Sequence, residues 1–402
     1  MNIVIIGAGL AGANAARELR AQGHAGDITL IGEEPHPPYE RPPLSKGLLL
    51  GNADPDSVFA HPTSWYADHQ VELITGQAVT DIDLDTSHVT LGDRRLSYDR
   101  LLLATGARPR RLPLADQSGA DVVYLRTIDD ALALAPRLTE RLLIVGAGWI
   151  GLEVASAARL TGGTVTIVEN ASLPLVRVLG PQIAPMVADL HREHGVDLRL
   201  GTSINAIEHA GGRTTVRLDD GTDVTPDLIL VGIGAEPDDT LAAKAGLATD
   251  HGVLVDARLR ASDPHVYAAG DVAHHDHPLH GRLRVEHWDT AIHHGRHAAR
   301  VMLGDDQPYV RQPYFFTDQY DLGMEYVGHV GQVGYDAVVI RGSIADRMFT
   351  ALWIADGHVA AGMHVNDWDA TDSLRSLVGR KATAAVRDTS ITLGEARAVG
   401  DG

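Results

Sequence analysis

The chain has 402 residues, 44% of them apolar, which is enough for two or three domains with ordinary hydrophobic cores. Its formal charge of -19 argues against nucleic acid or an anionic membrane as the main partner, because both require a concentrated positive surface. The absence of cysteine excludes disulfides, thiolate metal sites and dithiol redox chemistry.

We expect no targeting signal at the start of the chain. It enters an apolar strand without a basic leader region, and no apolar run reaches the ~18 residues that cross a bilayer. Nothing in the composition indicates large-scale disorder. We therefore expect a cytoplasmic protein without a membrane partner.

The N-terminal segment predicts a strand, a glycine-rich turn and a helix. Residues 3–6 are apolar and β-favouring, Gly7, Gly9 and Gly12 follow, and residues 13–21 are rich in alanine. Glycines with this spacing allow a tight turn, a close approach of a pyrophosphate and close packing of helix on strand. Glu33 follows the next predicted strand, where an acid binds a ribose. We predict a dinucleotide site; the alternative is that the glycines serve the turn only.

A proline-rich stretch at residues 35–46 follows, in which the prolines rule out a regular helix. The stretch is either a surface linker or a rigid support that presents Arg41 and Lys46 to a ligand. Residues 71–74, 78–84, 88–91 and 101–103 then read as short strands. The last of them ends at Ala104, Thr105 and Gly106, where small residues again let a ligand approach the backbone.

The opening pattern recurs 139 residues later. A strand over residues 142–145 runs into Gly146, Gly148, Ile150 and Gly151, and the next strand ends at an acid, Glu169. The chain therefore contains two nucleotide-binding units, and two dinucleotides in one chain indicate a flavin and a nicotinamide that exchange hydride. A further apolar strand, 228–231, ends at Gly232 and Gly234, which we expect to contact the second ligand.

A further strand is predicted at 266–269. Gly270 and Asp271 follow it and begin a helical turn. The histidine-rich residues 274–280 invite a metal site, but their proline and irregular spacing favour an exposed loop, and we predict no metal. The helix predicted at 289–303 aligns four basic side chains at helical spacing, which form either a solvated surface or a docking face for an acidic partner. They are His293, Arg296, His297 and Arg300.

A last unit is predicted from Arg311 onward. Residues 314–320 are its aromatic entrance, 347–354 and 358–364 form a hairpin, and 370–378 form a helix. The tail after Arg380 has no strong periodicity.

Taken together, these motifs resemble the FAD-dependent, NADH-using ferredoxin reductases of bacterial oxygenase systems. That family includes putidaredoxin reductase and rubredoxin reductase and shares the glutathione-reductase architecture. The resemblance rests on both fingerprints and on four further segments: 39–46, 104–106, 269–271 and 286–288. It implies an α/β fold with two Rossmann-like domains, for FAD and NAD, and a C-terminal α+β domain. The expected boundaries are 1–110 with 233–310 for FAD, 111–232 for NAD and 311–402 for the C-terminal domain.

The resemblance also implies roles for individual residues. The first fingerprint, Glu33, Ala104 to Gly106, Gly270 and Asp271 would bind FAD, and the flavin would lie beside Arg41, Pro43, Lys46, Glu286, His287 and Trp288. The second fingerprint, Arg177, Gly232 and Gly234 would bind NADH. Lys46 and Glu153 would meet at the reacting rings, where a lysine stabilises the charge that reduction develops; an ordinary ion pair is the alternative.

The choice between NADH and NADPH follows from electrostatics. The carboxylate of Glu169 accepts a hydrogen bond from the ribose 2′-OH and repels a 2′-phosphate, so we expect NADH. The nearest downstream cation, Arg177, lies eight residues further on.

Without cysteines, the flavin has to pass its electrons to a separate acceptor. We expect a two-iron ferredoxin that binds transiently at Arg296, Arg300 and Arg311. The alternatives are a rubredoxin as acceptor, or a redox-sensing protein in which turnover is incidental. Members of the family carry tryptophans in the segment that corresponds to residues 314–316, whereas this chain has Tyr314, Phe315 and Phe316, which weakens any electron path through indoles.

Overall fold

The computed structural model describes residues 1–331 and 334–399. The chain divides into two compact units. The first consists of Met1–Glu40, Asp56–Arg108 and Glu236–Phe315, and the second of Arg41–Pro55, Pro109–Ala235 and Phe316–Gly402. In the described residues, no helix is both long and apolar enough to cross a membrane.

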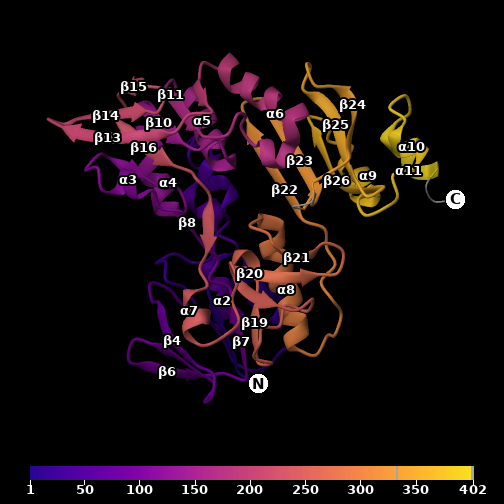
Figure 1. Ribbon diagram of the computed structural model, residues 1–402. Helices are drawn as coiled ribbons and strands as arrows, with labels where there is room; N and C mark the ends of the chain where they lie inside the picture. The colour runs from indigo at the N-terminus through magenta and orange to yellow at the C-terminus, as the bar shows by residue number, and fades with distance from the viewer. Residues whose placement is uncertain (332–333, 400–402) are drawn as a thin grey trace. The chain divides into compact units, whose positions relative to one another are not determined.

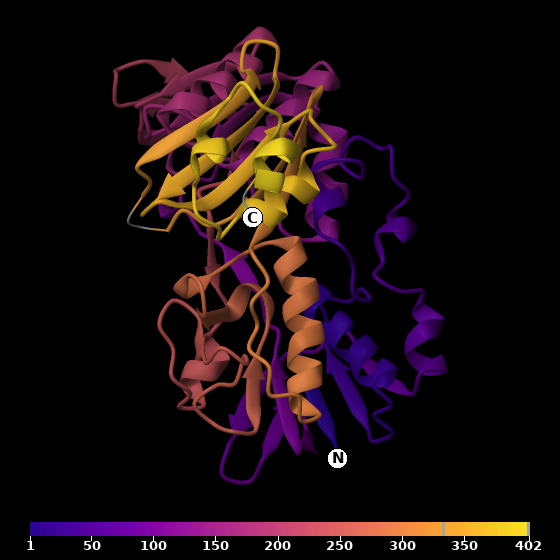
Figure 2. The same ribbon diagram turned by 90° about the vertical axis from the view of Figure 1, so that its right-hand side faces the viewer.

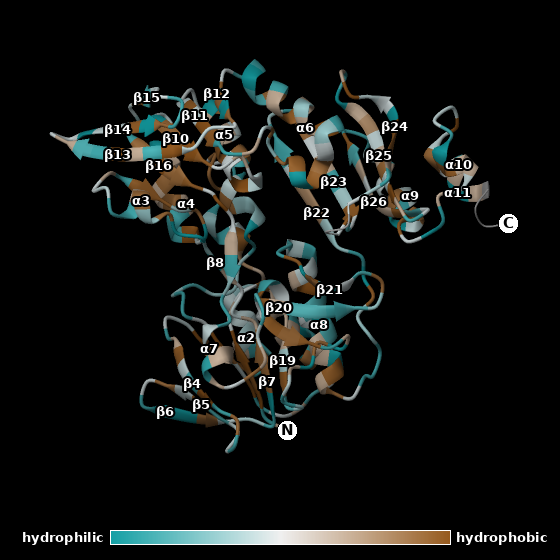
Figure 3. Cartoon of the chain, viewed as in Figure 1, coloured by the Kyte–Doolittle hydropathy of each residue, from teal (hydrophilic) through white to brown (hydrophobic). Residues whose placement is uncertain are grey.

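The first unit is built on a parallel sheet with strand order β19-β7-β1-β2-β3. Apart from the edge strand β3, which contains the exposed Glu72, its strands are largely buried apolar runs, as a parallel sheet requires, and β7 and β19 are mainly brown in Figure 3. They are β1 (Ile3–Ile6), β2 (Ile28–Ile31), β3 (Val71–Ile74), β7 (Arg100–Leu103) and β19 (Val266–Ala268).

Two long helices of this unit, α1 (Leu10–Ala21) and α8 (Trp288–Met302), pack side by side (Figure 2). Gly295 of α8 makes this possible, because a Cβ there would lie 2.2 Å from the carbonyl oxygen of Ala11. Smaller elements complete the unit: β4 (Val79–Asp83), β5 (His88–Leu91), β6 (Arg94–Ser97), β18 (Val253–Val255), β20 (Ala273–His277), β21 (Gly281–Arg284), α2 (Thr63–Asp68) and α7 (Thr240–Lys244).

The second unit repeats the parallel sheet, with order β12-β11-β10-β16-β9 (Figure 1). The strands are β9 (Val122–Val123), β10 (Arg141–Val145), β11 (Thr164–Glu169), β12 (Asp197–Leu200) and β16 (Leu228–Val231). Helices α5 (Trp149–Leu160) and α6 (Val176–Glu193) accompany it, with the shorter α3 (Pro113–Asp116) and α4 (Ile128–Leu134) and the antiparallel strands β13 (Ile204–Ala210), β14 (Arg213–Leu218) and β15 (Asp223–Val224). The internal duplication predicted from the two fingerprints is therefore confirmed.

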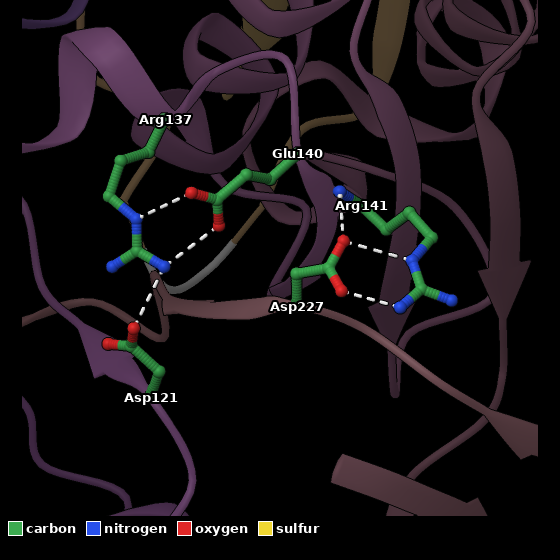
Figure 4. A network of polar contacts seen from close by, with 5 residues as sticks. All are labelled: Asp121, Arg137, Glu140, Arg141 and Asp227. Carbon is green, nitrogen blue, oxygen red and sulfur yellow. Dashed lines mark hydrogen bonds and ion pairs between the residues drawn. The ribbon is translucent and has the colours of Figure 1, made fainter. Parts of the chain in front are cut away.

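Ion pairs stabilise the second sheet near the beginning of β10 and β16 (Figure 4). Arg141 opens β10 and donates to both carboxylate oxygens of Asp227, the residue before β16. Arg137 bridges Glu140 and Asp121, each at 2.8 Å. The hydrogen bonds from Arg141 lower the pKa of Asp227 to about 2, so the pair persists throughout the neutral range.

The C-terminal part of the second unit is an antiparallel sheet with order β22-β23-β26-β25-β24. The predicted hairpin is confirmed as β25 (Met348–Ala355) and β26 (His358–Val365), which join β22 (Tyr314–Gln319), β23 (Leu322–Gly328) and β24 (Ala337–Ser343). Helices α9 (Thr371–Leu377), α10 (Ala384–Arg387) and α11 (Leu393–Val399) follow. The predicted α/β fold class with a C-terminal α+β part is thus confirmed.

The prediction of an exposed loop at residues 274–280 is wrong for residues 274–277, whereas residues 278–280 form a turn in which Leu279 is exposed. Residues 273–277 form β20, and the side chains of His275 and His277 are buried. His275 lies 4.7 Å from the ring of His294, which in turn lies 4.4 Å from the ring of Tyr309, measured between ring centroids. The sequence pattern misled because tertiary packing, and not local spacing, decides whether a polar strand is covered.

His275, His294 and His297 form a buried histidine cluster, in which each ring contacts the ring of Tyr309. Burial lowers the pKa of all three, in His275 to about 3, and the charges of neighbouring histidines lower it further in His275 and His294. Among the described residues, neither ring nitrogen of His294 has a hydrogen-bond partner. The folded protein therefore holds these imidazoles neutral at pH 7.

We predict that acid destabilises the fold through this cluster. Below pH ~6.5 these histidines are protonated in the unfolded chain but stay neutral in the folded protein. The free energy of unfolding therefore falls as the pH falls, by up to about 1.4 kcal/mol per histidine per pH unit. Urea unfolding at pH 7.0, 6.0 and 5.0 measures the slope, and H294F should make it shallower. Equal unfolding free energies at pH 7.0 and 5.0 would contradict the prediction.

Candidate functional site

In the first unit, the predicted FAD residues gather at the carboxyl ends of neighbouring parallel strands. Gly7 follows β1, Ala104 follows β7 and Gly270 lies shortly after β19. Gly7 has φ of 112°, and a Cβ on it would lie 2.0 Å from the carbonyl oxygen of Ala104. Only glycine fits there, so this close approach fixes the turn between β1 and α1.

The space beside the second glycine suits a pyrophosphate. A Cβ on Gly9 would meet no atom within 4 Å, and within the described residues no side chain caps α1. Gly12 packs against the turn, since a Cβ on it would lie 2.2 Å from the carbonyl oxygen of Gly7. The first amides of α1 are therefore available to an anionic ligand, and the residues present fit a dinucleotide.

Near this fingerprint, Glu33, Arg108 and Asp238 form a network of ion pairs that the sequence did not predict. Glu33 is 64% exposed and lies 3.2 Å from Arg108, which also bonds to Asp238 at 2.9 Å. Thr105 donates to the backbone oxygen of Asp238 at 2.6 Å. Glu33 thus remains accessible to a ribose while Arg108 holds its carboxylate in place.

The segment 286–288 leads into α8. Trp288 begins this helix, and its indole N–H donates to Glu40 at 3.1 Å. The ring of His287 lies 4.8 Å from that of Phe315, and Glu286 is paired with Arg284. Asp271 lies in the short helical turn Gly270–Val272. The roles of these residues beside a flavin remain proposals.

The second unit repeats the same construction. Gly146 has φ of 103°, and a Cβ on it would lie 2.5 Å from the carbonyl oxygen of Gly232. A Cβ on Gly148 would meet only that oxygen, at 3.8 Å, so space for a ligand remains. Gly151 packs against Gly146 as Gly12 does against Gly7, and Ile150, in the first turn of α5, is exposed.

Glu169 ends β11 and faces this second fingerprint. Its carboxylate accepts hydrogen bonds from the backbone N–H groups of Ala147 and Ala171, both at 2.8 Å. These bonds hold the carboxylate next to the glycine turn, as a ribose-binding acid requires. Arg177 lies on α6 with an exposed side chain, and Gly234 adopts φ of 102° after β16.

The predicted pair of Lys46 and Glu153 is present within the second unit. Lys46 Nζ lies 2.7 Å from Glu153 Oε1, and Glu153 is only 5% exposed. Its carboxylate also accepts hydrogen bonds from the hydroxyl groups of Ser45 and Thr317. A short helical turn over Pro42–Ser45 brings Ser45 and Lys46 to this point, and Pro43 is part of it.

Two further contacts complete this site. Lys46 Nζ lies 5.4 Å from the centre of the Phe316 ring, and Arg41 donates to the backbone oxygen of Arg126. No sequence pattern indicated Thr317, which lies 164 residues after Glu153. Ser45 could have been found only as the neighbour of Lys46.

The three arginines predicted to dock a partner differ in their contacts. Arg311 binds the buried carboxylate of Asp289 through two hydrogen bonds of 2.7 and 2.8 Å. Arg300 is paired with Glu18 at 3.0 Å. Among the residues that the structure describes, Arg296 bonds only to the neutral side chain of Asn14, at 3.0 Å, so its charge is the least compensated of the three.

The pair of Asp289 and Arg311 holds its charge in a buried setting. Burial acts to raise the pKa of Asp289, but the hydrogen bonds from Arg311 and His293 outweigh it and lower the pKa to about 2. Arg311 is therefore a structural cation of the first unit as well as a candidate contact.

The predicted basic face of α8 needs one correction. His297 is buried in the histidine cluster and not aligned with Arg296 and Arg300 on the surface. Arg17 of α1 adds to the positive charge near Arg296 in place of His297. It is exposed and, like Arg296, forms no ion pair with a carboxylate in the described part of the chain. Burial and the charges of Arg17 and Arg296 lower the pKa of His61, whose ring centre lies 4.4 Å from that of Trp65.

In residues 1–331 and 334–399, histidine, aspartate and glutamate side chains form no group of three or more that could hold a metal ion.

Comparison with known proteins identifies both parts of the chain. Residues 1–295 match the family model described as pyridine nucleotide-disulphide oxidoreductase, and residues 314–396 match the model described as reductase C-terminal. The chain is 39% identical to putidaredoxin reductase of Pseudomonas putida over 377 residues, which cover 91% of this chain and 88% of that protein. It is 40% identical to rhodocoxin reductase of Rhodococcus erythropolis over 355 residues, which cover 87% and 83%.

Solved structures agree. The covalent putidaredoxin reductase–putidaredoxin complex contains a chain that matches with a TM-score of 0.95 at 36% identity, covering 100% of this chain and 99% of that one. The ferredoxin reductase for the CYP199A2 system of Rhodopseudomonas palustris matches with a TM-score of 0.93 at 37% identity, covering 99% and 100%. The chain belongs to the pyridine nucleotide-disulphide oxidoreductase family and carries the reductase C-terminal domain.

Proposed function

We propose that the protein is an FAD-dependent NADH:ferredoxin reductase that supplies electrons to an oxygenase in the cytoplasm. The observation that carries this proposal is the pair of complete dinucleotide fingerprints in one chain that has no cysteine. Disulfide reductases and sulfenate-forming oxidases need thiols beside the flavin. A cysteine-free member of the family therefore needs an external acceptor for its electrons.

The relatives support the nature of that acceptor. Several of them are named as ferredoxin–NAD(+) reductase components of dioxygenase systems, among them the anthranilate 1,2-dioxygenase system of Burkholderia cepacia at 38% identity. Putidaredoxin is the partner in the covalent complex described above. A two-iron ferredoxin is the partner that we propose here.

The domain organisation follows from this function. Residues 1–110 with 233–310 form the proposed FAD domain, 111–232 the proposed NAD domain and 311–402 the proposed C-terminal domain; the last three residues lie outside those that the structure describes. The first unit supplies Gly7, Gly9 and Gly12 for the FAD pyrophosphate and Glu33 for its ribose. We propose that residues later in the chain also contact the FAD: Ala104, Thr105, Gly106, Gly270, Asp271, Glu286, His287 and Trp288.

FAD held by these residues would supply an acceptor for the hydride of NADH and a donor of single electrons to the ferredoxin. Lys46 contributes a fixed positive charge where negative charge develops, and Glu153 keeps that ammonium group in one position. Arg41 and Pro43 belong to the same proline-held segment as Lys46. The second fingerprint with Glu169, Gly232 and Gly234 binds NADH, and Arg177 lies exposed on the following helix.

A panel of acceptors tests the function as a whole. With NADH as donor, the holoprotein should reduce two-iron ferredoxins of oxygenase systems at least about tenfold more efficiently than rubredoxins, as judged by kcat/KM. A small dye that needs no docking serves as the control for reduction by NADH. Fast dye reduction without reduction of any ferredoxin would contradict the proposed acceptor, and no reduction by NADH would contradict the proposed function itself.

Glu169 should determine the choice of nicotinamide cofactor. E169Q removes the negative charge that repels a 2′-phosphate, so the ratio of kcat/KM for NADH to that for NADPH should fall about tenfold, as expected for the loss of one charged hydrogen bond. E208Q changes an exposed glutamate on β13 of the same unit and should leave the ratio unaltered. The same ratio in E169Q as in the wild type would remove Glu169 from this role.

The docking arginines should differ in their effects, because their contacts differ. R296E should raise the KM for ferredoxin about tenfold at low salt and R300E less, since Glu18 already offsets the charge of Arg300. Both effects should shrink at high salt. R311E should instead lower the melting temperature, because it leaves Asp289 buried without its partner.

The control is R95E, on β6 of the same unit, which reverses a more exposed charge that is paired with Asp83. Reduction of the dye by NADH should be unchanged in R296E, R300E and R95E. A ferredoxin KM in R296E equal to that of R95E would show that this surface does not dock the partner.

A further inference from the structure

A buried row of hydrogen bonds leads away from Glu153 within the second unit. Thr317 Oγ1 donates to Glu153 Oε1 at 2.6 Å, and Gln319 Nε2 donates to Thr317 Oγ1 at 3.1 Å. Gln319 Oε1 lies 2.9 Å from His191 Nε2. The side chains of Thr317, Gln319 and His191 are all buried, so water does not compete for these bonds.

The donors and acceptors of this row can be assigned one by one. Thr317 has a single hydroxyl proton, which goes to the carboxylate, so its oxygen must accept from the amide N–H of Gln319. The carbonyl oxygen of Gln319 therefore faces His191, which must carry its proton on Nε2. Burial lowers the pKa of His191 to about 4, so its ring is neutral at pH 7 and Nδ1 is free to accept.

The far end of the row lies at Tyr320, in the turn after β22. Its hydroxyl is 3.4 Å from His191 Nδ1, and its ring stacks on His194 with 3.6 Å between ring centres. The backbone N–H of Tyr320 donates to Ser156 of α5 at 2.8 Å. Every donor in the row thus points toward Glu153, and the turn is tied to the same helix that carries Glu153.

This row cannot conduct a proton. Gln319 accepts through its oxygen and donates through its nitrogen, and an amide does not pass a proton between these two atoms under ordinary conditions. The row can only fix the orientation of the groups that it joins.

We infer that Thr317 and Gln319 are positioning residues for the Lys46–Glu153 pair. The carboxylate of Glu153 is held by Ser45 on one oxygen and by Lys46 and Thr317 on the other, which leaves it a single orientation. Gln319 in turn fixes the direction of the Thr317 hydroxyl. The first strand of the C-terminal sheet, β22, therefore takes part in holding Lys46; that this serves hydride transfer rests on the function proposed above.

Lysine-selective labelling tests the positioning directly, because the chain has only three lysines, Lys46, Lys244 and Lys381. In the ¹⁵N-lysine holoprotein, the ammonium protons of Lys46 should exchange with water slowly enough to be detected, and K46R assigns the signal. T317V should broaden this signal, whereas T317S, which keeps the hydroxyl, should restore it. Lys244, whose partner Asp81 is exposed, is the internal control for fast exchange.

Single-turnover reduction of the bound FAD by NADH gives the second measurement. T317V should slow this step about tenfold with little change in the Kd of NADH, consistent with one lost hydrogen bond to a charged group. Q319L, one bond further away, should slow it about threefold, and Y320F should have no effect. A purely structural role would not give this graded order, and it would affect melting temperature or FAD retention before the rate.

The outcomes separate the two proposals. Fast ammonium exchange at Lys46 in the wild type, or a T317V variant with both the wild-type signal and the wild-type rate, would overturn the positioning role. The positioning role would also be overturned if T317S failed to restore the rate of FAD reduction by NADH. If NADH does not reduce the wild type at all, the proposed function fails, while the exchange measurement still decides whether Thr317 holds Lys46.

Discussion

The structure depends on one steric constraint that occurs twice. The first glycine of each fingerprint lies so close to the end of a neighbouring strand that a Cβ would be 2.0 Å from the carbonyl oxygen of Ala104 in one unit and 2.5 Å from that of Gly232 in the other. Each glycine also has a positive φ, which other residues rarely adopt. This contact sets where the strand ends and the helix begins, and it leaves open space beside Gly9 and Gly148.

Helix α5 combines two tasks because of where it begins. Its N-terminus lies within the second fingerprint, and Glu153 lies only two residues after Gly151 on the same helix. The element proposed to bind the pyrophosphate of NADH is therefore the one that holds the ammonium group of Lys46. A rigid helix keeps these two features at a constant separation, which a loop would not.

The cationic surface of the first unit consists of Arg17 and Arg296, whose charges both act on His61. The chain has 53 acidic and 34 basic residues, and other arginines of this unit, such as Arg94, Arg95 and Arg300, are paired with a carboxylate. Arg17 and Arg296 have no such carboxylate in the described part of the chain. The histidines of α8 do not add to this charge, because His294 and His297 are buried and neutral. An acidic partner would therefore meet a small positive area in an otherwise acidic protein.

The sequence by itself determined the two nucleotide-binding units, the positions of the acids Glu33 and Glu169 that we propose to bind ribose, and the need for an external electron acceptor. These features are local: a positive φ, a close backbone approach and the lack of a thiol each require a particular residue at a particular position. Tertiary structure alone decided that Ser45 and Thr317 meet at Glu153, that His297 is buried and that residues 273–277 form a covered strand. Periodicity describes only one element at a time, and none of these facts exists until a second element packs against the first.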